Sequence, residues 1–188
     1  MLSPDLLNAV HTDRLDAVRQ LHQDGTDLRV VGAEALRLAA AGGHLEVLRY
    51  LHQNGVSLAV LHDEDITNIA ERGHLPVIEY LHRHGFDLRK NADMLFRRAA
   101  AGGHLPVIRY LHINGAAIDA CNNEPLLLAA EQGHLEIVRY LHRNGANLRI
   151  LRLKAPHRAT AAGRKGIVRY LRENGGFVPD PIETPYPS

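Results

Sequence analysis

The sequence predicts an all-α solenoid, in which six helix-turn-helix pairs with short connecting loops are stacked side by side. The first observation is a period of 30 residues, and a fixed period between about 20 and 50 residues is typical of solenoids. The second is that each period holds two segments with the apolar spacing of a helix. The third is a glycine at the end of each period, which can close a helix in the left-handed conformation. These glycines are Gly25, Gly55, Gly85, Gly115, Gly145 and Gly175.

The composition is that of an ordinary globular protein. The chain has 188 residues, of which 45% are hydrophobic and 23% charged, and the formal net charge is +1. This balance excludes a disordered chain and argues against a general binder of polyanions, so nucleic acid is not an expected partner. The single cysteine, Cys121, excludes a disulfide within the chain and a cysteine-based zinc site. No signal sequence or membrane span is expected, which predicts a cytoplasmic protein.

The second helix of each pair is the more regular one. In the fifth copy it follows His134, and Leu135, Val138 and Leu141 lie on one face of the helix. Leucine, histidine and tyrosine recur in it at the same spacing, and Asn precedes the closing glycine in four of the six copies. Gly-His-Leu marks its start in the four central copies, and the histidine there is expected to bond the backbone of the loop.

The first helix is expected to be shorter, over residues 124–132 in the fifth copy. Ser3, Asp63, Asp93 and Asn123 form a column of residues that suit the start of a helix. The expected buried column is Leu6, Leu36, Ile66, Phe96 and Leu126, and a column of alanines interrupted by Ile69 follows it. One further apolar column, Leu28, Leu58, Leu88, Ile118, Leu148 and Val178, is expected to pack each connecting loop onto the stack.

The repeats form one domain over residues 1–178, with units at about 1–30, 31–60, 61–90, 91–120, 121–150 and 151–178. The first and last units depart from the pattern, as expected of caps that face water on one side. The tail, 179–188, is rich in proline and should be extended or disordered.

The fifth copy, EPLLLAAEQGHLEIVRYLHRNGANL, resembles an ankyrin repeat, whose common pattern is TPLHLAAxxGHLEVVxLLLxxGADVN. The resemblance covers nearly the whole chain. The period is three residues shorter than is usual for ankyrin repeats, and the shortened part is the β-hairpin loop that connects one repeat to the next. Shortened repeats with YLH in the second helix are similar to those of amoebal, oomycete, giant-virus and host-associated bacterial arrays. The resemblance implies a non-enzymatic scaffold that binds another protein on its concave face. We expect a monomer that is located in the cytoplasm or, for an effector, in the host cytosol.

No residue pattern indicates catalysis, a cofactor or a metal. Equivalent histidines are one repeat apart, about 10 Å if the helices pack at ordinary spacing, which is too far for shared zinc ligands. His82 with His84, or His62, are the only weak metal candidates. The Gly-Gly pairs at Gly42 and Gly102 lack the remainder of a phosphate-binding loop.

The candidate partner-binding residues lie on the first helices and in the turns between helices. Arg37, Thr67, Arg97 and Leu127 form one expected exposed column, and Glu71, Arg72, Glu131 and Gln132 lie in the turns. Residues differ within these columns, as they would on a binding face or on an unconstrained surface.

The carboxy-terminal end is basic, with ten basic residues and no acidic one between positions 139 and 172. The candidate basic patch at this end consists of Arg149, Arg152, Arg158, Arg164 and Arg169. It is either a solvated cap or a binding site for an acidic partner. The alternative functions are therefore a binder of nucleic acid or a phospholipid headgroup, or an adaptor or effector that recruits a substrate.

Overall fold

The computed structural model describes residues 4–118, 120–154 and 165–175, with the backbone alone for 120–122 and 152–154. Helices are the only regular structure in these ranges, and the predicted absence of strands from the stack is confirmed there. The bounds are α1 Pro4–His11, α2 Leu15–Gln23, α3 Leu28–Gly42, α4 Leu45–Gln53, η1 Leu58–Val60, α5 Asp63–Glu71, α6 Leu75–Arg83, α7 Ala92–Gly102, α8 Leu105–Ile113, α9 Ala120–Gln132, α10 Leu135–Arg143, α11 Arg149–Lys154 and α12 Lys165–Glu173.

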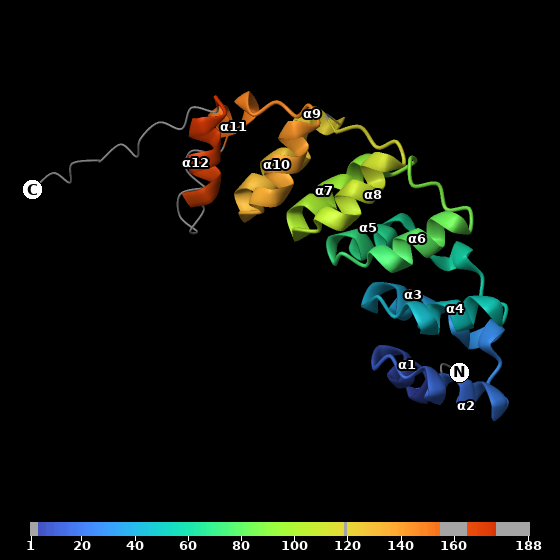
Figure 1. The fold of residues 1–188 in the computed structure, drawn as a ribbon. Helices are drawn as coiled ribbons and strands as arrows, with labels where there is room; N and C mark the ends of the chain where they lie inside the picture. Colours follow the sequence, from blue (N-terminus) through green and yellow to red (C-terminus); the bar gives the residue numbers. More distant parts are fainter. Residues whose placement is uncertain (1–3, 119, 155–164, 176–188) are drawn as a thin grey trace, which may run out of the picture.

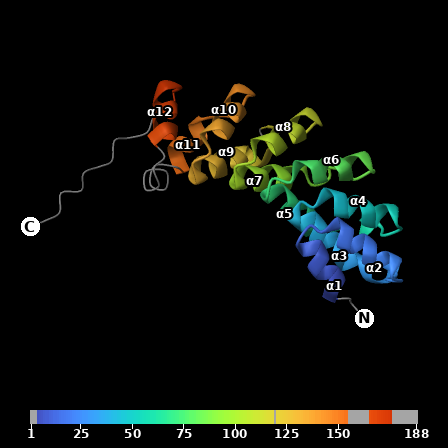
Figure 2. The ribbon, with the colours of Figure 1, turned by 60° about the horizontal axis from the view of Figure 1, so that its bottom comes forward.

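Helices pair in chain order, and the pairs stack into a curved array, as Figure 1 shows. The first helices α1, α3, α5, α7, α9 and α11 contact one another in sequence. In Figure 2 these helices line the inner side of the curve, whereas the second helices lie on its outer side. The predicted solenoid of six helix pairs is therefore confirmed. The predicted tail at 179–188 lies outside the described residues.

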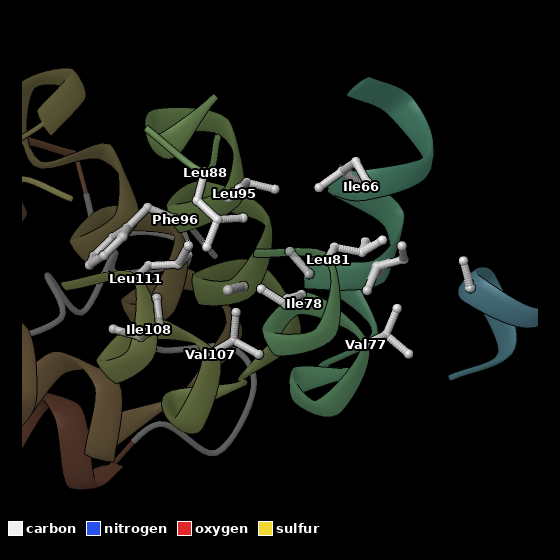
Figure 3. Close-up of a cluster of buried hydrophobic side chains, with 14 of the residues drawn as sticks. Ile66, Val77, Ile78, Leu81, Leu88, Leu95, Phe96, Val107, Ile108 and Leu111 are labelled. Carbon is white, nitrogen blue, oxygen red and sulfur yellow. The ribbon is translucent and has the colours of Figure 1, made fainter. Parts of the chain in front are cut away.

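The repeated apolar columns form one continuous core. Four members of the predicted first-helix column, Leu6, Leu36, Ile66 and Phe96, are fully buried, and Leu126 is 1% exposed. Figure 3 shows side chains of neighbouring repeats meeting in this cluster. A side chain in a central repeat is thus covered by its own helix pair and by both adjacent pairs, so burial depends on stacking.

The loop column is also buried where the structure describes it, with one exception. Leu28, Leu88, Ile118 and Leu148 are buried, whereas Leu58 is half-buried in the short 3-10 helix η1. Val178 lies outside the described residues.

Each second helix of the first five pairs is followed by a glycine with a positive φ, as predicted, and α4 shows the arrangement with Asn before the glycine. At the end of α4, Gly55 has a φ of +95°. Beyond it, the N–H of Val56 donates to the carbonyl oxygen of Leu51 at 3.1 Å. The side-chain amide of Asn54 donates to the Tyr50 carbonyl oxygen at 2.8 Å. These bonds satisfy carbonyl groups that the last turn leaves open.

The first helices differ from the prediction in length and in their starting residues. They are as long as the nine-residue second helices or longer in the second to fifth pairs, and α3 reaches 15 residues. Asp63 is the first residue of α5 and Asp93 lies within α7, and neither is the residue that precedes its helix. Asn123 lies within α9, and Ser3 lies outside the described residues.

The extension of α3 has a local cause. Asp27 precedes the helix and its Oδ1 accepts a hydrogen bond from the N–H of Arg29 at 2.9 Å. Gly32 then lets the first turns of α3 lie close to the loop after α4, because an added Cβ would come within 2.5 Å of Val56 Cγ2. Part of the expected connecting loop is therefore helical.

Within the described residues, none of the helices has the length and apolar character needed to span a membrane.

Candidate functional site

The inner side of the array carries a set of ion pairs that join successive first helices. Arg37 Nε of α3 lies 3.2 Å from Asp65 Oδ1 of α5. Arg98 of α7 reaches back to Glu71 of α5, also at 3.2 Å. Charged groups on this side therefore pair across repeats and remain part of its polar surface.

A third pair continues the set. Arg97 Nη1 of α7 lies 3.2 Å from Glu124 Oε2 of α9, and each side chain is 42% exposed. Partly exposed ion pairs contribute little to stability, about 0–1 kcal/mol each. These groups can consequently exchange their internal partner for a group on another molecule at little cost.

The predicted exposed column is only half-exposed, and one of its members is buried. Thr67 is 5% exposed, and its hydroxyl donates to the Glu64 carbonyl oxygen at 2.9 Å. Arg37, Arg97 and Leu127 are half-buried. The prediction of exposure was wrong for Thr67, because the close stacking of first helices covers this column from the adjacent repeat.

The turn residues lie where the sequence placed them, at the ends of the first helices. Glu71, Arg72 and Gln132 are exposed and Glu131 is half-buried. Arg72 Nε donates to the Asn68 side chain at 2.9 Å, and its Nη1 lies 3.4 Å from the Ala41 carbonyl oxygen of the preceding repeat.

Two of the four histidines of the Gly-His-Leu motifs, His74 and His134, bond backbone as predicted, but in the preceding repeat. His44 Nδ1 instead lies 3.5 Å from Asp13 Oδ1 of the first repeat. His74 Nε2 lies 3.1 Å from the Ala41 carbonyl oxygen, and His134 Nε2 lies 3.0 Å from that of Ala101. Burial lowers the pKa of His74, and the bond to Ala41 opposes that shift. Burial thus favours the neutral form of the His74 ring. The bond from this ring to Ala41 links the two adjacent repeats.

The outer side carries a feature that the sequence analysis did not identify, a ladder of histidine–tyrosine hydrogen bonds between successive second helices. In each rung a histidine Nδ1 lies 2.7–2.9 Å from the hydroxyl of the tyrosine 28 residues later. The rungs of this His–Tyr ladder are His22–Tyr50, His52–Tyr80, His82–Tyr110, His112–Tyr140 and His142–Tyr170.

A signal for the ladder was present in the sequence. The first copy has Gln20 in place of the tyrosine, and the sixth has Arg172 in place of the histidine. These are the two positions at which a rung between adjacent repeats would lack its partner.

Hydrogen bonds of the second helices account for two of the three histidines proposed as weak metal candidates. His82 Nδ1 bonds Tyr110, and His84 Nδ1 donates to the Tyr80 carbonyl oxygen at 2.8 Å. His62 is exposed at the start of α5. Among the described residues, no three His, Cys, Asp or Glu side chains are grouped so that they could hold a metal ion.

Two of the basic residues at the carboxy-terminal end form ion pairs with acidic residues, which the sequence did not indicate. Arg169 Nε lies 2.8 Å from Glu173 Oε1 within α12, and Arg139 Nη1 lies 3.3 Å from Glu136 Oε1 within α10. Both acids lie just outside the acid-free stretch. Arg149 is exposed at the start of α11. The side chain of Arg152 and the whole of Arg158 and Arg164 lie outside the described residues.

Comparison with known proteins agrees with this geometry. A family model described as ankyrin repeats (3 copies) matches residues 95–180. The ankyrin repeat domain of human ASB11, a crystal structure, is similar with a TM-score of 0.63 and 23% sequence identity, over 78% of this chain and 71% of that chain. A search of curated proteins found no match. Ankyrin repeats are generally protein–protein interaction modules without enzymatic activity. The chain has the ankyrin-repeat fold, and its carboxy-terminal half matches the ankyrin repeats in sequence.

Proposed function

We propose that this protein is a non-enzymatic scaffold that binds a partner protein along its inner side, through the first helices and the turns that follow them. One observation carries the proposal: polar and charged residues that differ from repeat to repeat line the inner side, while the packing columns stay alike. Packing explains the constant columns, and a surface that recognises one partner would require the variable ones.

The residues proposed to contact the partner are Arg37, Arg97 and Leu127 on the helices, and Glu71, Arg72, Glu131 and Gln132 in the turns. Thr67 is withdrawn as a contact because its side chain is buried. The ion pairs of Arg37 and Arg97 support the proposal in one respect, since both guanidinium groups are partly exposed and can turn from their internal partner to a partner protein at little cost.

The test is affinity purification from the native source with matched surface variants. The inner variant combines Arg72→Glu with Gln132→Arg, and the outer control combines Arg83→Glu with Gln53→Arg, so both have the same net charge. All four residues are exposed, and the fold should be unaffected. Loss of the same retained protein with the inner variant alone would support the proposal. Equal retention by both variants would contradict it.

The alternative, an anionic partner at the basic end, is a separate prediction with a separate signature. Its affinity should fall steeply with salt, because counterions are released when a polyanion is bound. The pairing of Arg139 and Arg169 with acids of their own helices reduces the free positive charge there. The adaptor or effector role, the monomeric state, the cytoplasmic or host-cytosolic location and the similarity to host-associated arrays stay predictions.

A further inference from the structure

The inner side of the second and third repeats is hollowed between the first turns of α3 and the short helix η1. This hollow has a volume of about 510 Å3 and is lined by Val30, Val31, Glu34 and Arg37 of α3 and by Val60 and His62 of η1 and the loop that follows it. The hollow results from the extension of α3. This helix begins at Leu28 and includes Val30 and Val31, whereas the neighbouring first helix α5 begins only at Asp63, later in its repeat. We call it the α3–η1 hollow.

The apolar lining of the α3–η1 hollow includes one highly exposed side chain. Val30 is 74% exposed and is one of three large hydrophobic residues in the described ranges that are notably exposed, with Met94 and Ile113. Val31 and Val60 beside it are half-buried. The corresponding position in the fourth repeat is Lys90, so the packing of the array does not require an apolar side chain here.

Glu34 and Arg37 are the two permanently charged residues of the described lining, and the acidic surplus near the α3–η1 hollow comes from the residues that follow His62. Arg37 is its one permanently charged cation among the described lining residues, and it already contacts Asp65 at 3.2 Å and Glu34 at 3.9 Å. Asp63 and Glu64 follow His62 directly and are exposed, and Asp63 Oδ1 accepts a hydrogen bond from the side-chain amide of Asn91 in the next repeat at 2.6 Å. The guanidinium group of Arg29 does not line the hollow, and its side chain lies over Gly55 on the adjacent loop.

We propose that the α3–η1 hollow binds a segment of another protein in which an aliphatic or aromatic side chain is flanked by lysine or arginine. The apolar side chain would cover Val30, Val31 and Val60, and the flanking cations would face Glu34 and Glu64. This inference rests on the proposed function, because it names the partner chemistry at one place on the inner side. The acidic surplus selects the sign of the partner's charge, and charge complementarity of this kind acts on specificity and association rate.

The experiment is selection of a phage-displayed library of random peptides against the immobilised full chain, followed by affinity measurement with a selected peptide. Enriched peptides should combine an apolar side chain with adjacent Lys or Arg. Val30→Asn should weaken their binding at least about tenfold, as expected for an anchor at the centre of an interface. Glu64→Gln should slow association, and its effect should shrink at high salt.

Ile113→Asn is the matched control. Ile113 is 81% exposed and lies at the end of α8, so this variant removes a similar exposed aliphatic side chain at another place. Circular dichroism should show both variants folded, since valine and asparagine have similar helix propensities and neither Val30 nor Ile113 belongs to the core.

Four outcomes would overturn the proposal. The first is enrichment of acidic or uncharged peptides, and the second is no enrichment at all. The third is binding that tolerates Val30→Asn but is lost with Arg72→Glu and Gln132→Arg, which would leave the proposed function standing without this site. The fourth is Val30-dependent self-association in sedimentation, which would assign the α3–η1 hollow to a second copy of the chain.

Discussion

The Nδ1 atom of His112 lies 2.7 Å from the hydroxyl oxygen of Tyr140, which is 28 residues further along the chain. The rings meet edge to face with their centroids 5.8 Å apart. Arg109 lies over the same tyrosine ring, 5.5 Å from its centroid. Tyr140 is thus held from α8 by a hydrogen bond and by a cation–π contact, and both contacts join adjacent repeats.

Removing one side of this rung should reveal a coupling between repeats. In a double-mutant cycle of His112→Ala and Tyr140→Phe, the two changes should be non-additive by about 0.5–1.5 kcal/mol, the net contribution of one hydrogen bond. Urea unfolding of the four proteins measures this coupling. A control cycle of His112→Ala with Tyr80→Phe pairs residues from different rungs, and it should be additive within about 0.3–0.5 kcal/mol. Equal coupling in both cycles would contradict the ladder.

The stability of the array should fall when the pH drops below about 6.5, the ordinary pKa of histidine. Burial lowers the pKa of His52, with a smaller contribution from His84, whose ring centroid lies 5.1 Å from that of His52. Burial also lowers the pKa of His74, and the nearby Arg72, His44 and His104 add to this. The unfolded chain therefore binds more protons than the folded one between the unfolded and the folded pKa, and the free energy of unfolding falls as the pH falls through that window.

Urea unfolding midpoints at pH 7.5 and 5.5 would measure this dependence, since most Asp and Glu stay ionised over that range. The double variant His52→Gln and His74→Gln should show a weaker loss of stability between the two pH values than the unchanged protein. A midpoint that rises on acidification, or the same loss in the double variant, would contradict the prediction.

Stacking and the ends of the second helices could be predicted from the sequence because they depend on contacts that recur in every repeat. The closing glycines all have a positive φ, and the leucine column recurs at the same place in each second helix, so the pattern of one repeat explains the others. The Asn column has the same basis. Asn54, Asn114, Asn144 and Asn174 each donate to the tyrosine carbonyl oxygen four residues earlier, and His84 donates the same bond where Asn is missing.

The first helices and the inner side could not be predicted equally well, because their lengths depend on pairs of residues that occur once. Gly32 against Val56 has no equivalent in the other repeats, and it permits the long α3 that forms the α3–η1 hollow. The burial of Thr67 likewise depends on the neighbouring first helices, which the column pattern alone did not indicate. Contacts between adjacent repeats, rather than residues within one repeat, decide these features.

The glycine of the Gly-His-Leu motif should be needed for two separable reasons. Gly43 has a φ of +75°, and an added Cβ would lie 2.4 Å from Nδ1 of His74 in the next repeat. Gly145 also has a positive φ, +104°, but an added Cβ would have nothing within 4 Å. Gly145→Ala should therefore cost about 1–2 kcal/mol for the left-handed backbone, and Gly43→Ala should cost that and a further 1–3 kcal/mol or so for overpacking.

Unfolding in urea gives both costs, and a third variant separates the two causes. In a His74→Ala background the ring is absent, so Gly43→Ala should cost no more than Gly145→Ala. If the excess cost of Gly43→Ala persists without the ring, the contact with His74 is not its cause.

The position of a leucine along the stack should decide how much its removal destabilises the protein. Leu111 in α8 is 1% exposed and lies between second helices on both sides, α6 and α10. Leu21 occupies the same column in α2 but is only partly buried, and α4 is the one second helix that contacts α2. Leu111→Ala should cost about 2–5 kcal/mol, the range for a buried leucine that leaves a cavity. Leu21→Ala should cost less, because its repeat has a neighbour on one side only and can relax toward solvent.

The two variants are compared by their urea midpoints, with the slope of the transition as the control. An unchanged slope means that both variants expose the same surface area on unfolding, so the midpoints report stability directly. A lower slope for Leu111→Ala alone would indicate that the array unfolds in parts once its centre is weakened, as nearest-neighbour coupling between repeats allows. Equal midpoint shifts with equal slopes would show that burial in this column does not depend on the number of neighbouring repeats, and would contradict the stacked arrangement as the source of stability.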